Sequence, residues 1–385
     1  MRKARILPAI IFSQFTGTSL WFAGNAVLGD IQQAWGLDAG VIGRMTSAVQ
    51  LGFITGALCF AWFSIADRYS PRLIFLLCSL LGAAANLSIF LAGGPWSLMV
   101  LRFVTGFFLA GIYPVGMKVA ASWYDKELGK AIGFLVGALV LGTAFPHLVK
   151  SMGHTLPWQV VMAVVSGLAV VGGFTLYFLV PDGPHLPRAS QFNPGALLVM
   201  FRSADFRAAS FGYFGHMWEL YAFWAFVPFA VNHYALGRGL YQLDVSFWSF
   251  LIIAIGFFGC AVGGLLSRRF GSARVAWVQL LASGSCCLLS PLAFAAPPGI
   301  FFCVLLVWGI TVIGDSPQFS ALTAQTAPRD VVGSALTIVN CIGFSITIVS
   351  IQLLDMLSKT VEPRFLFLAL VVGPLFGLRF IRRLL

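Results

Sequence analysis

Long apolar runs separated by short polar interruptions make up nearly the whole chain. A membrane-spanning helix needs about 20 mostly apolar residues, and cutting at clusters of polar residues, Pro and Gly leaves twelve runs of roughly that length. The predicted spans are 6–28, 46–65, 72–94, 96–118, 130–150, 157–180, 206–234, 244–266, 273–296, 299–322, 333–355 and 363–381. The longest interruption divides six spans from six. The pattern predicts an all-α membrane protein with six-helix halves at 1–180 and 206–385, joined by a cytoplasmic linker at 181–205.

Two polar, basic hairpins repeat at related positions in these halves. Residues 264–274 read Gly-Leu-Leu-Ser-Arg-Arg-Phe-Gly-Ser-Ala-Arg, and residues 63–72 read Phe-Ser-Ile-Ala-Asp-Arg-Tyr-Ser-Pro-Arg. They are about 200 residues apart, close to half the chain, which is typical of a transporter built from two similar halves.

Composition and charge support a membrane location. Of the 385 residues 59% are hydrophobic and 10% are charged, whereas a soluble domain carries about 25% charged residues. The net charge of +11 does not indicate a nucleic-acid partner, because the basic residues flank predicted helices in short segments. Most of them fall on one side if both termini are cytoplasmic, so we expect a multi-pass protein of a bacterial-type inner membrane that contacts anionic lipid.

Several function classes lack their sequence signatures. All seven cysteines fall inside predicted spans without metal-ligand spacing. No phosphate-binding loop, dinucleotide fingerprint or nucleophile elbow occurs. We therefore expect no metal, no cofactor, no enzymatic activity and no ATP hydrolysis by the chain itself.

The hairpins resemble the signature loops of the major facilitator superfamily, whose first copy runs roughly Gly-x-x-x-Asp-Arg-x-Gly-Arg-Arg. In span four, Arg102-Phe-Val-Thr-Gly106 is similar to the family's Arg-x-x-x-Gly segment, and Gly111-Ile-Tyr-Pro114 has a counterpart in Gly314-Asp-Ser-Pro317. The resemblance implies an alternating-access transporter whose hairpins latch its cytoplasmic face. The predicted gating residues are Asp67, Arg68, Arg72, Arg268, Arg269 and Arg274. Alternatively these charges only fix topology, and Arg268, in place of the family's acid, makes the two copies unequal.

Ionisable residues deep in predicted spans are candidates for function because a charge in hydrocarbon is costly. Arg102 could grip an anionic substrate or take part in coupling, or it could form a structural salt bridge with Glu219 or Asp315. Glu219 is the first choice for taking up and releasing a proton, and His216, three residues earlier, could share it. Asp315 is a second candidate, or it bonds backbone freed by Pro317.

Polar and aromatic side chains at helical spacing predict a cavity wall. In span one these are Gln14, Thr18, Trp21 and Asn25, and in span seven they are Trp218, Tyr221 and Trp224. Tyr113, Gln318 and Asn340 are weaker candidates. Such walls suit a flat or amphipathic organic molecule held by stacking and a few hydrogen bonds.

The sequence thus predicts a monomeric, proton-coupled transporter of a small organic solute. An organic anion is favoured, because Arg102 and Lys118 both lie on span four. One alternative is a proton-antiport exporter of drugs or amphipathic metabolites, since the Gly-rich span five with Pro146 resembles the family's antiport segment. An alternative of another class is a non-transporting membrane receptor or assembly protein.

Overall fold

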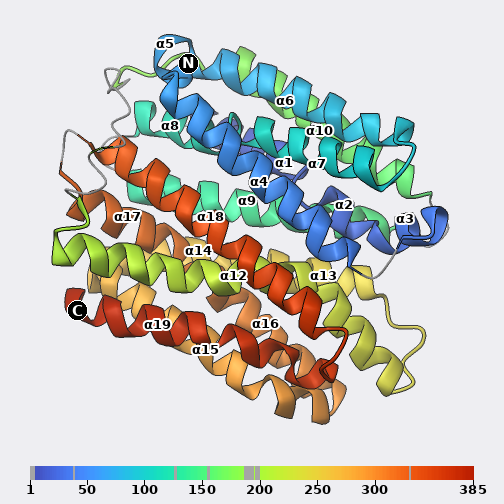
Figure 1. The fold of residues 1–385 in the computed structure, drawn as a ribbon. Helices are drawn as coiled ribbons and strands as arrows, with labels where there is room; N and C mark the ends of the chain where they lie inside the picture. Colours follow the sequence, from blue (N-terminus) through green and yellow to red (C-terminus); the bar gives the residue numbers. More distant parts are fainter. Residues whose placement is uncertain are drawn as a thin grey trace. The chain divides into compact units, whose positions relative to one another are not determined.

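The structure is a computed structural model, and it describes residues 5–37, 40–124, 128–153, 157–185, 195, 200–328 and 331–385. The chain divides into two compact units, Met1–Pro194 and Gly195–Leu385. Most of the predicted linker, residues 186–194 and 196–199, lies outside the described residues. In each unit the described residues form helices and no strands, as Figure 1 shows.

The described residues of unit 1 form six helical crossings, a crossing being one passage of the chain from one end of the unit to the other. Two of them, the first and the fourth, are interrupted by non-helical residues. They are α1 (Ile6–Thr18) with α2 (Ala23–Ala26) and α3 (Leu28–Trp35); α4 (Val41–Trp62); α6 (Pro71–Leu87) with η2 (Ser88–Leu91); α7 (Pro95–Leu109) with α8 (Tyr113–Trp123); α9 (Leu128–Ser151); and α10 (Trp158–Leu179). A short helix, α5 (Ile65–Arg68), lies in the first hairpin. The first crossing extends to Trp35, beyond the predicted end at residue 28, and residues 19–22 interrupt it.

Unit 2 repeats this order within its described residues. Its crossings are α12 (Ala204–Gly237); α13 (Val245–Ala254) with α14 (Gly256–Phe270); α15 (Ser272–Ala295); α16 (Pro298–Gly314) with α17 (Ser316–Thr326); α18 (Val332–Leu357); and η3 (Pro363–Leu370) with α19 (Val372–Ile381) and η4 (Arg382–Leu384). The tenth crossing breaks at Asp315, between α16 and α17. Counting each broken crossing once, the described residues hold the predicted twelve transmembrane helices.

Ten of these crossings are long and apolar enough to span a membrane by length and composition. The other two begin the two units. Helix α1 is apolar but has only 13 residues before the break, and α12 carries His216 and Glu219 among its aromatic residues. The two crossings that do not meet the length and composition of a membrane span are therefore the ones that carry most of the predicted binding residues.

Close helix packing within each unit depends on glycine. A Cβ added at Gly106 of α7 would collide with the backbone of Val49 in α4, and one at Gly309 of α16 would collide with the backbone of Ile252 in α13. In a membrane, small residues of this kind let helices approach where the hydrophobic effect gives no reason to associate. The fourth and tenth crossings are held against their neighbours in the same way.

The two hairpins turn with different backbones. In the first copy Ser64 takes the left-handed conformation (φ 51°), and Ser70 has φ −57°. In the second copy Gly271 has φ 85°, a value that favours glycine. The first copy has Ser70 where the second has Gly271, and it places its left-handed residue six positions earlier.

Candidate functional site

Arg102 bridges the break in the first crossing of unit 1. Its side chain is fully buried, and its terminal nitrogens donate to the carbonyl oxygens of Leu20 (3.3 and 3.4 Å) and Trp21 (2.5 Å) and to Asn86 Oδ1 (3.1 Å). The Asn86 amide donates in turn to Ser166 Oγ at 3.0 Å. A helix that stops inside a membrane leaves carbonyl groups without partners, and each costs several kcal/mol in hydrocarbon. Arg102 supplies the donors that the break requires.

No carboxylate compensates the charge of Arg102 within the described residues. The predicted alternative, a salt bridge to Glu219 or Asp315, would join the two units and stays a prediction; within unit 2 these acids contact Trp308 and His216. All hydrogen-bond partners of the guanidinium are neutral, and its Nε is buried without a partner in the described chain. Unit 1 therefore holds an uncompensated buried positive charge.

Glu219 is enclosed by three side-chain donors in unit 2. Its Oε1 accepts from Trp308 Nε1 of α16 (2.6 Å) and from Cys287 Sγ of α15 (3.3 Å). Its Oε2 accepts from Ser283 Oγ of α15 at 2.9 Å, and the residue is 1% exposed. The ring of Phe223 stacks on Trp308 with centroids 4.4 Å apart. This carboxyl group ties α12 to both α15 and α16.

His216 contacts Asp315 rather than Glu219. His216 Nδ1 lies 2.8 Å from Asp315 Oδ1, and both side chains are almost completely buried. The predicted sharing of a proton between His216 and Glu219 therefore has no direct contact to support it. Asp315 occupies the junction of α16 and α17, and its side chain makes no capping hydrogen bond to α17. Its carboxylate nevertheless lies against the backbone N–H groups of Asp315 and Ser316, so the alternative that it bonds backbone next to Pro317 stays a prediction.

The predicted wall residues of unit 1 differ in their surroundings. Asn25 donates to Thr46 Oγ1 of α4 (2.8 Å), and the Trp21 ring lies 4.9 Å from that of Phe53 of α4. Gln14 is fully buried against α8, and neither of its amide atoms has a partner in the described residues. Trp21 and Asn25 thus share one neighbouring helix, while Gln14 faces another.

Sequence reasoning missed two polar residues of this unit. Gln50, on α4 between Thr46 and Phe53, is fully buried, and its amide is unbonded within the described part of the chain. Asn86 was the other, and it contacts Arg102. Both are isolated amides inside predicted apolar spans, and this isolation could have identified them as candidate site residues from the sequence. A buried amide requires hydrogen-bond partners, and Gln50 can still bond one through its amide nitrogen and oxygen.

In unit 2 the predicted wall residues separate into two groups. Tyr221 and Trp224 of α12 are buried, with ring centroids 5.3 Å apart, and Tyr221 lies 5.2 Å from Phe344 of α18. Gln318 of α17 is buried, while Asn340 of α18 is half-buried. Tyr113, in unit 1, begins α8 and is also half-buried. Helices α12 and α18 thus share an aromatic contact that includes the predicted residue Tyr221.

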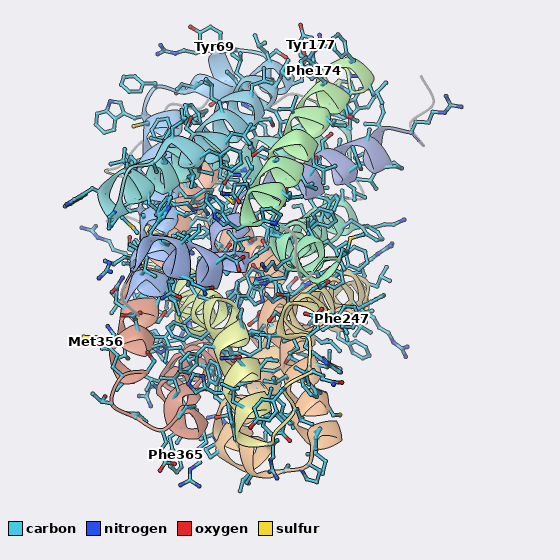
Figure 2. The ribbon with its side chains drawn as sticks, turned by 90° about the vertical axis from the view of Figure 1, so that its right-hand side faces the viewer. Tyr69, Phe174, Tyr177, Phe247, Met356 and Phe365 are labelled. Atoms are coloured by element: carbon cyan, nitrogen blue, oxygen red, sulfur yellow. The ribbon has the colours of Figure 1, made fainter. Side chains whose placement is uncertain are left out.

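The first hairpin is tied into unit 1 by ion pairs that the sequence did not indicate. Asp67 pairs with Lys118 of α8, whose Nζ also donates to the Ala66 carbonyl (2.6 Å). Arg72 lies 3.6 Å from Asp182, beyond the end of α10, and over the ring of Tyr177. Figure 2 labels Tyr69 and Tyr177 at this end of the unit. The acid and the arginine of the motif thus bind other elements of unit 1 rather than each other.

The second hairpin has no such ties among the described residues of unit 2. Arg268, Arg269 and Arg274 are exposed, and the contact found is that of Arg269 with the ring of its neighbour Phe270. Arg68 of the first copy is exposed as well. The inequality expected from Arg268 is therefore visible as a difference in ion pairing.

The described residues contain no group of three or more His, Cys, Asp or Glu side chains that could hold a metal ion. The groups of this site are a fixed cation in unit 1, and two buried acids and a histidine in unit 2. These groups can hold an anion and transfer protons, and none of them is arranged as a nucleophile with an adjacent base.

Comparison with known proteins gives matches over most of the chain. The chain is 25% identical over 291 residues to the Probable sulfoacetate transporter SauU of Cupriavidus necator, which covers 69% of this chain and 66% of the relative. It is 27% identical over 160 residues to the D-galactonate transporter of Escherichia coli, covering 41% and 36%. The chain thus spans less than two thirds of the length of these relatives.

A solved structure has the same fold. The proton:xylose symporter XylE matches with a TM-score of 0.78 at 12% identity, covering 99% of this chain and 96% of that chain. A sequence model described as Major Facilitator Superfamily matches residues 10–351. The repeated hairpins, the twelve crossings and this match agree, and the chain belongs to the Major Facilitator Superfamily of membrane transporters.

Proposed function

We propose that this protein is a proton-coupled, alternating-access transporter of a small organic anion across a bacterial-type inner membrane, with both termini cytoplasmic. The observation that carries the proposal is the contrast between the two buried sites. Unit 1 holds a cation without a carboxylate partner, and unit 2 holds two acids and a histidine. The first arrangement favours an anion, and the second can accept and release a proton.

The anion class is supported by the charge of Arg102. The guanidinium bonds only neutral groups among the described residues of unit 1, so none of their carboxylates cancels its charge. Sulfoacetate and D-galactonate, the solutes named for two relatives, are both organic anions. Gln50 adds a buried amide with unused donors and an acceptor, which suits a hydroxylated or sulfonated acid.

The proton site that we propose is Glu219, with the pair of His216 and Asp315 as its neighbour in unit 2. Glu219 accepts hydrogen bonds from three side chains on two other helices. A proton arriving at Oε1 would compete with the Trp308 indole for that oxygen. Proton uptake would thus change how α12 is held against α15 and α16, which is the kind of change an alternating-access cycle needs.

Reconstituted protein tests the proposal. Liposomes with an imposed pH gradient should accumulate radiolabelled galactonate or sulfoacetate, and collapse of the gradient should abolish the accumulation. Glu219→Gln should lose gradient-driven accumulation but keep exchange of labelled for unlabelled anion, because the amide oxygen can still accept from Trp308 while the amide nitrogen donates to the Ser283 hydroxyl. Proton-driven accumulation by Glu219→Gln equal to that of the unmodified protein would overturn the assignment of Glu219.

A matched control separates the proton site from general damage. Glu362→Gln removes an exposed acid of unit 2 and should leave accumulation unchanged. Expulsion of lipophilic cations, with no movement of either anion, would favour the exporter alternative. Absence of movement of any solute, with intact folding, would favour a receptor.

A further inference from the structure

A pocket of about 290 Å³ opens at one end of unit 2, away from the buried acids. It lies where α12 and α15 end and η3 begins, which by chain order is the opposite membrane face from the basic hairpin at Gly271. The side chains that carry the argument are His233, Arg238, Phe294, Glu362 and Arg364. The pocket is large enough for a phosphate group with a short polar substituent.

The charged side chains around this pocket differ in how many hydrogen bonds fix them. Arg238 is anchored because its Nη2 donates to the carbonyl oxygens of Phe294 (3.4 Å), Ala295 and Ala296 (3.0 Å). Its Nε and Nη1 make no hydrogen bond within the described residues, so they remain available to a ligand. Arg364 Nε pairs with Glu362 Oε2 at 2.6 Å, and these side chains are 50% and 63% exposed. Both signs of charge are thus presented at one opening.

A ligand that complements these groups carries both an anion and a cation. A phosphodiester can receive hydrogen bonds from Arg238 and from the terminal nitrogens of Arg364, and arginine is suited to phosphate. A primary ammonium can donate to Glu362, which has a second carboxylate oxygen in addition to the one bound by Arg364. An anion without a cationic group would be repelled by the carboxylate of Glu362.

The surface below the pocket indicates that the ligand has acyl chains. On α15 an apolar stripe made of Val278, Leu281, Leu288 and Leu292 is exposed, with Leu292 at 68%. These residues recur at helical spacing, and Ala295, three positions after Leu292 on the same helix face, lines the pocket. In a membrane protein such a stripe faces lipid chains, and charged residues at its end lie at headgroup depth.

We propose that this pocket binds the headgroup of a zwitterionic phospholipid with a primary amine, phosphate against Arg238 and Arg364 and ammonium against Glu362. The chains lie along the stripe of α15. Bound there, the lipid bridges α12, α15 and η3 at the face opposite the basic hairpin. The site is independent of the proposed transport activity.

Native mass spectrometry of the purified full-length protein tests the site. Phosphatidylethanolamine, phosphatidylglycerol and phosphatidylcholine of equal chain length are added in turn, and the retained adducts are counted. The unmodified protein should retain the ethanolamine lipid most strongly. Arg364→Gln should weaken retention of the ethanolamine and glycerol lipids about tenfold, as expected for loss of a charge-assisted hydrogen bond. Glu362→Gln should remove the preference for ethanolamine over glycerol. Lys359→Gln, which removes a cation paired with Asp355 outside the pocket, serves as the matched control and should change neither.

Two results would overturn the proposal. One is equal retention of all three lipids by the unmodified protein and by both pocket variants, which would make the binding nonspecific. The other is competition by glycerophosphoethanolamine, which lacks acyl chains, at the same concentration as the lipid. That outcome would assign the pocket to a soluble zwitterion instead.

Discussion

The two units bury Arg102 and Glu219 in different crossings and with opposite chemistry. In unit 1 the fourth crossing supplies Arg102, which bonds the broken first crossing and Asn86 of the third. In unit 2 the first crossing supplies Glu219, which accepts from the third and fourth crossings of that unit. A guanidinium keeps its charge, whereas a carboxyl group can lose it by taking up a proton. The comparison thus distinguishes the fixed charge of Arg102 from the charge of Glu219, which changes when the carboxyl group takes up a proton.

The largest effect should come from removing the fixed charge. Arg102→Met leaves the carbonyl groups of Leu20 and Trp21 without donors, and we expect the free energy of unfolding to fall by about 3 kcal/mol because buried groups lose their partners. Thermal unfolding in detergent and uptake by liposomes measure this. Arg68→Gln, at an exposed arginine of the same unit, should leave the free energy of unfolding unchanged. If Arg102→Met matched the stability of Arg68→Gln, the helix break would not depend on the guanidinium.

Arg102→Lys sharpens the comparison because it keeps the charge and loses the planar fork. One ammonium cannot reach the carbonyls of the break and Asn86 with the same geometry. We expect a loss of about 1 to 2 kcal/mol in stability, smaller than for Met, with retention of anion over cation selectivity. Selectivity is measured by competition between an organic anion and its uncharged amide. Equal loss of selectivity in both variants would show that geometry rather than charge selects the anion.

In unit 2 the two acids can be ranked against each other. Glu219→Gln should abolish proton-driven accumulation, at least tenfold below the unmodified protein, because no carboxyl group remains among its three donors. Asp315→Asn keeps a polar contact with His216 and should retain part of the accumulation. Uptake at fixed inward pH gradients compares them. A complete loss in Asp315→Asn with normal accumulation in Glu219→Gln would move the proton site to the histidine pair.

The hairpins give the smallest expected effect. Lys118→Gln breaks the pair with Asp67, and exposed pairs are worth about 0.2 to 1 kcal/mol. Arg268→Gln breaks no ion pair with the described residues of unit 2 and should leave stability unchanged. Urea or thermal unfolding of the two variants side by side checks the difference. A larger loss in Arg268→Gln would reveal a partner for the second hairpin.

Much of the fold was predictable because the bilayer imposes a strong sequence pattern. Apolar length predicted the twelve crossings, and the repeated hairpins predicted their division into two halves. The break at residues 19–22 was not predictable, because the run from Ile6 to Leu28 contains no charged residue, and the donors that satisfy the break come from Arg102, about 80 residues later.

The identity of the buried ionisable residues was predictable from the sequence, and their contacts were less so. The free-energy cost of placing an ionisable side chain in hydrocarbon identified Arg102, His216, Glu219 and Asp315 from the sequence. Their partners depend on which helices pack together, so spacing on α12 paired His216 with Glu219, whereas packing brought it to Asp315 on another crossing. Polar residues that bond a charge, such as Asn86 and Ser283, look like ordinary small interruptions in apolar runs.

The hydrogen bond between Trp308 and Glu219 also makes the protein its own optical reporter. An indole whose N–H points at a carboxylate emits at a wavelength that depends on the charge of that group, and the stacked ring of Phe223 holds the indole in a fixed orientation. In a variant that keeps Trp308 and replaces the other ten of the 11 tryptophans with Phe, emission would follow the occupancy of the carboxyl group by a proton in real time. The proton uptake that we propose for Glu219 could then be followed without a label and before any solute is identified.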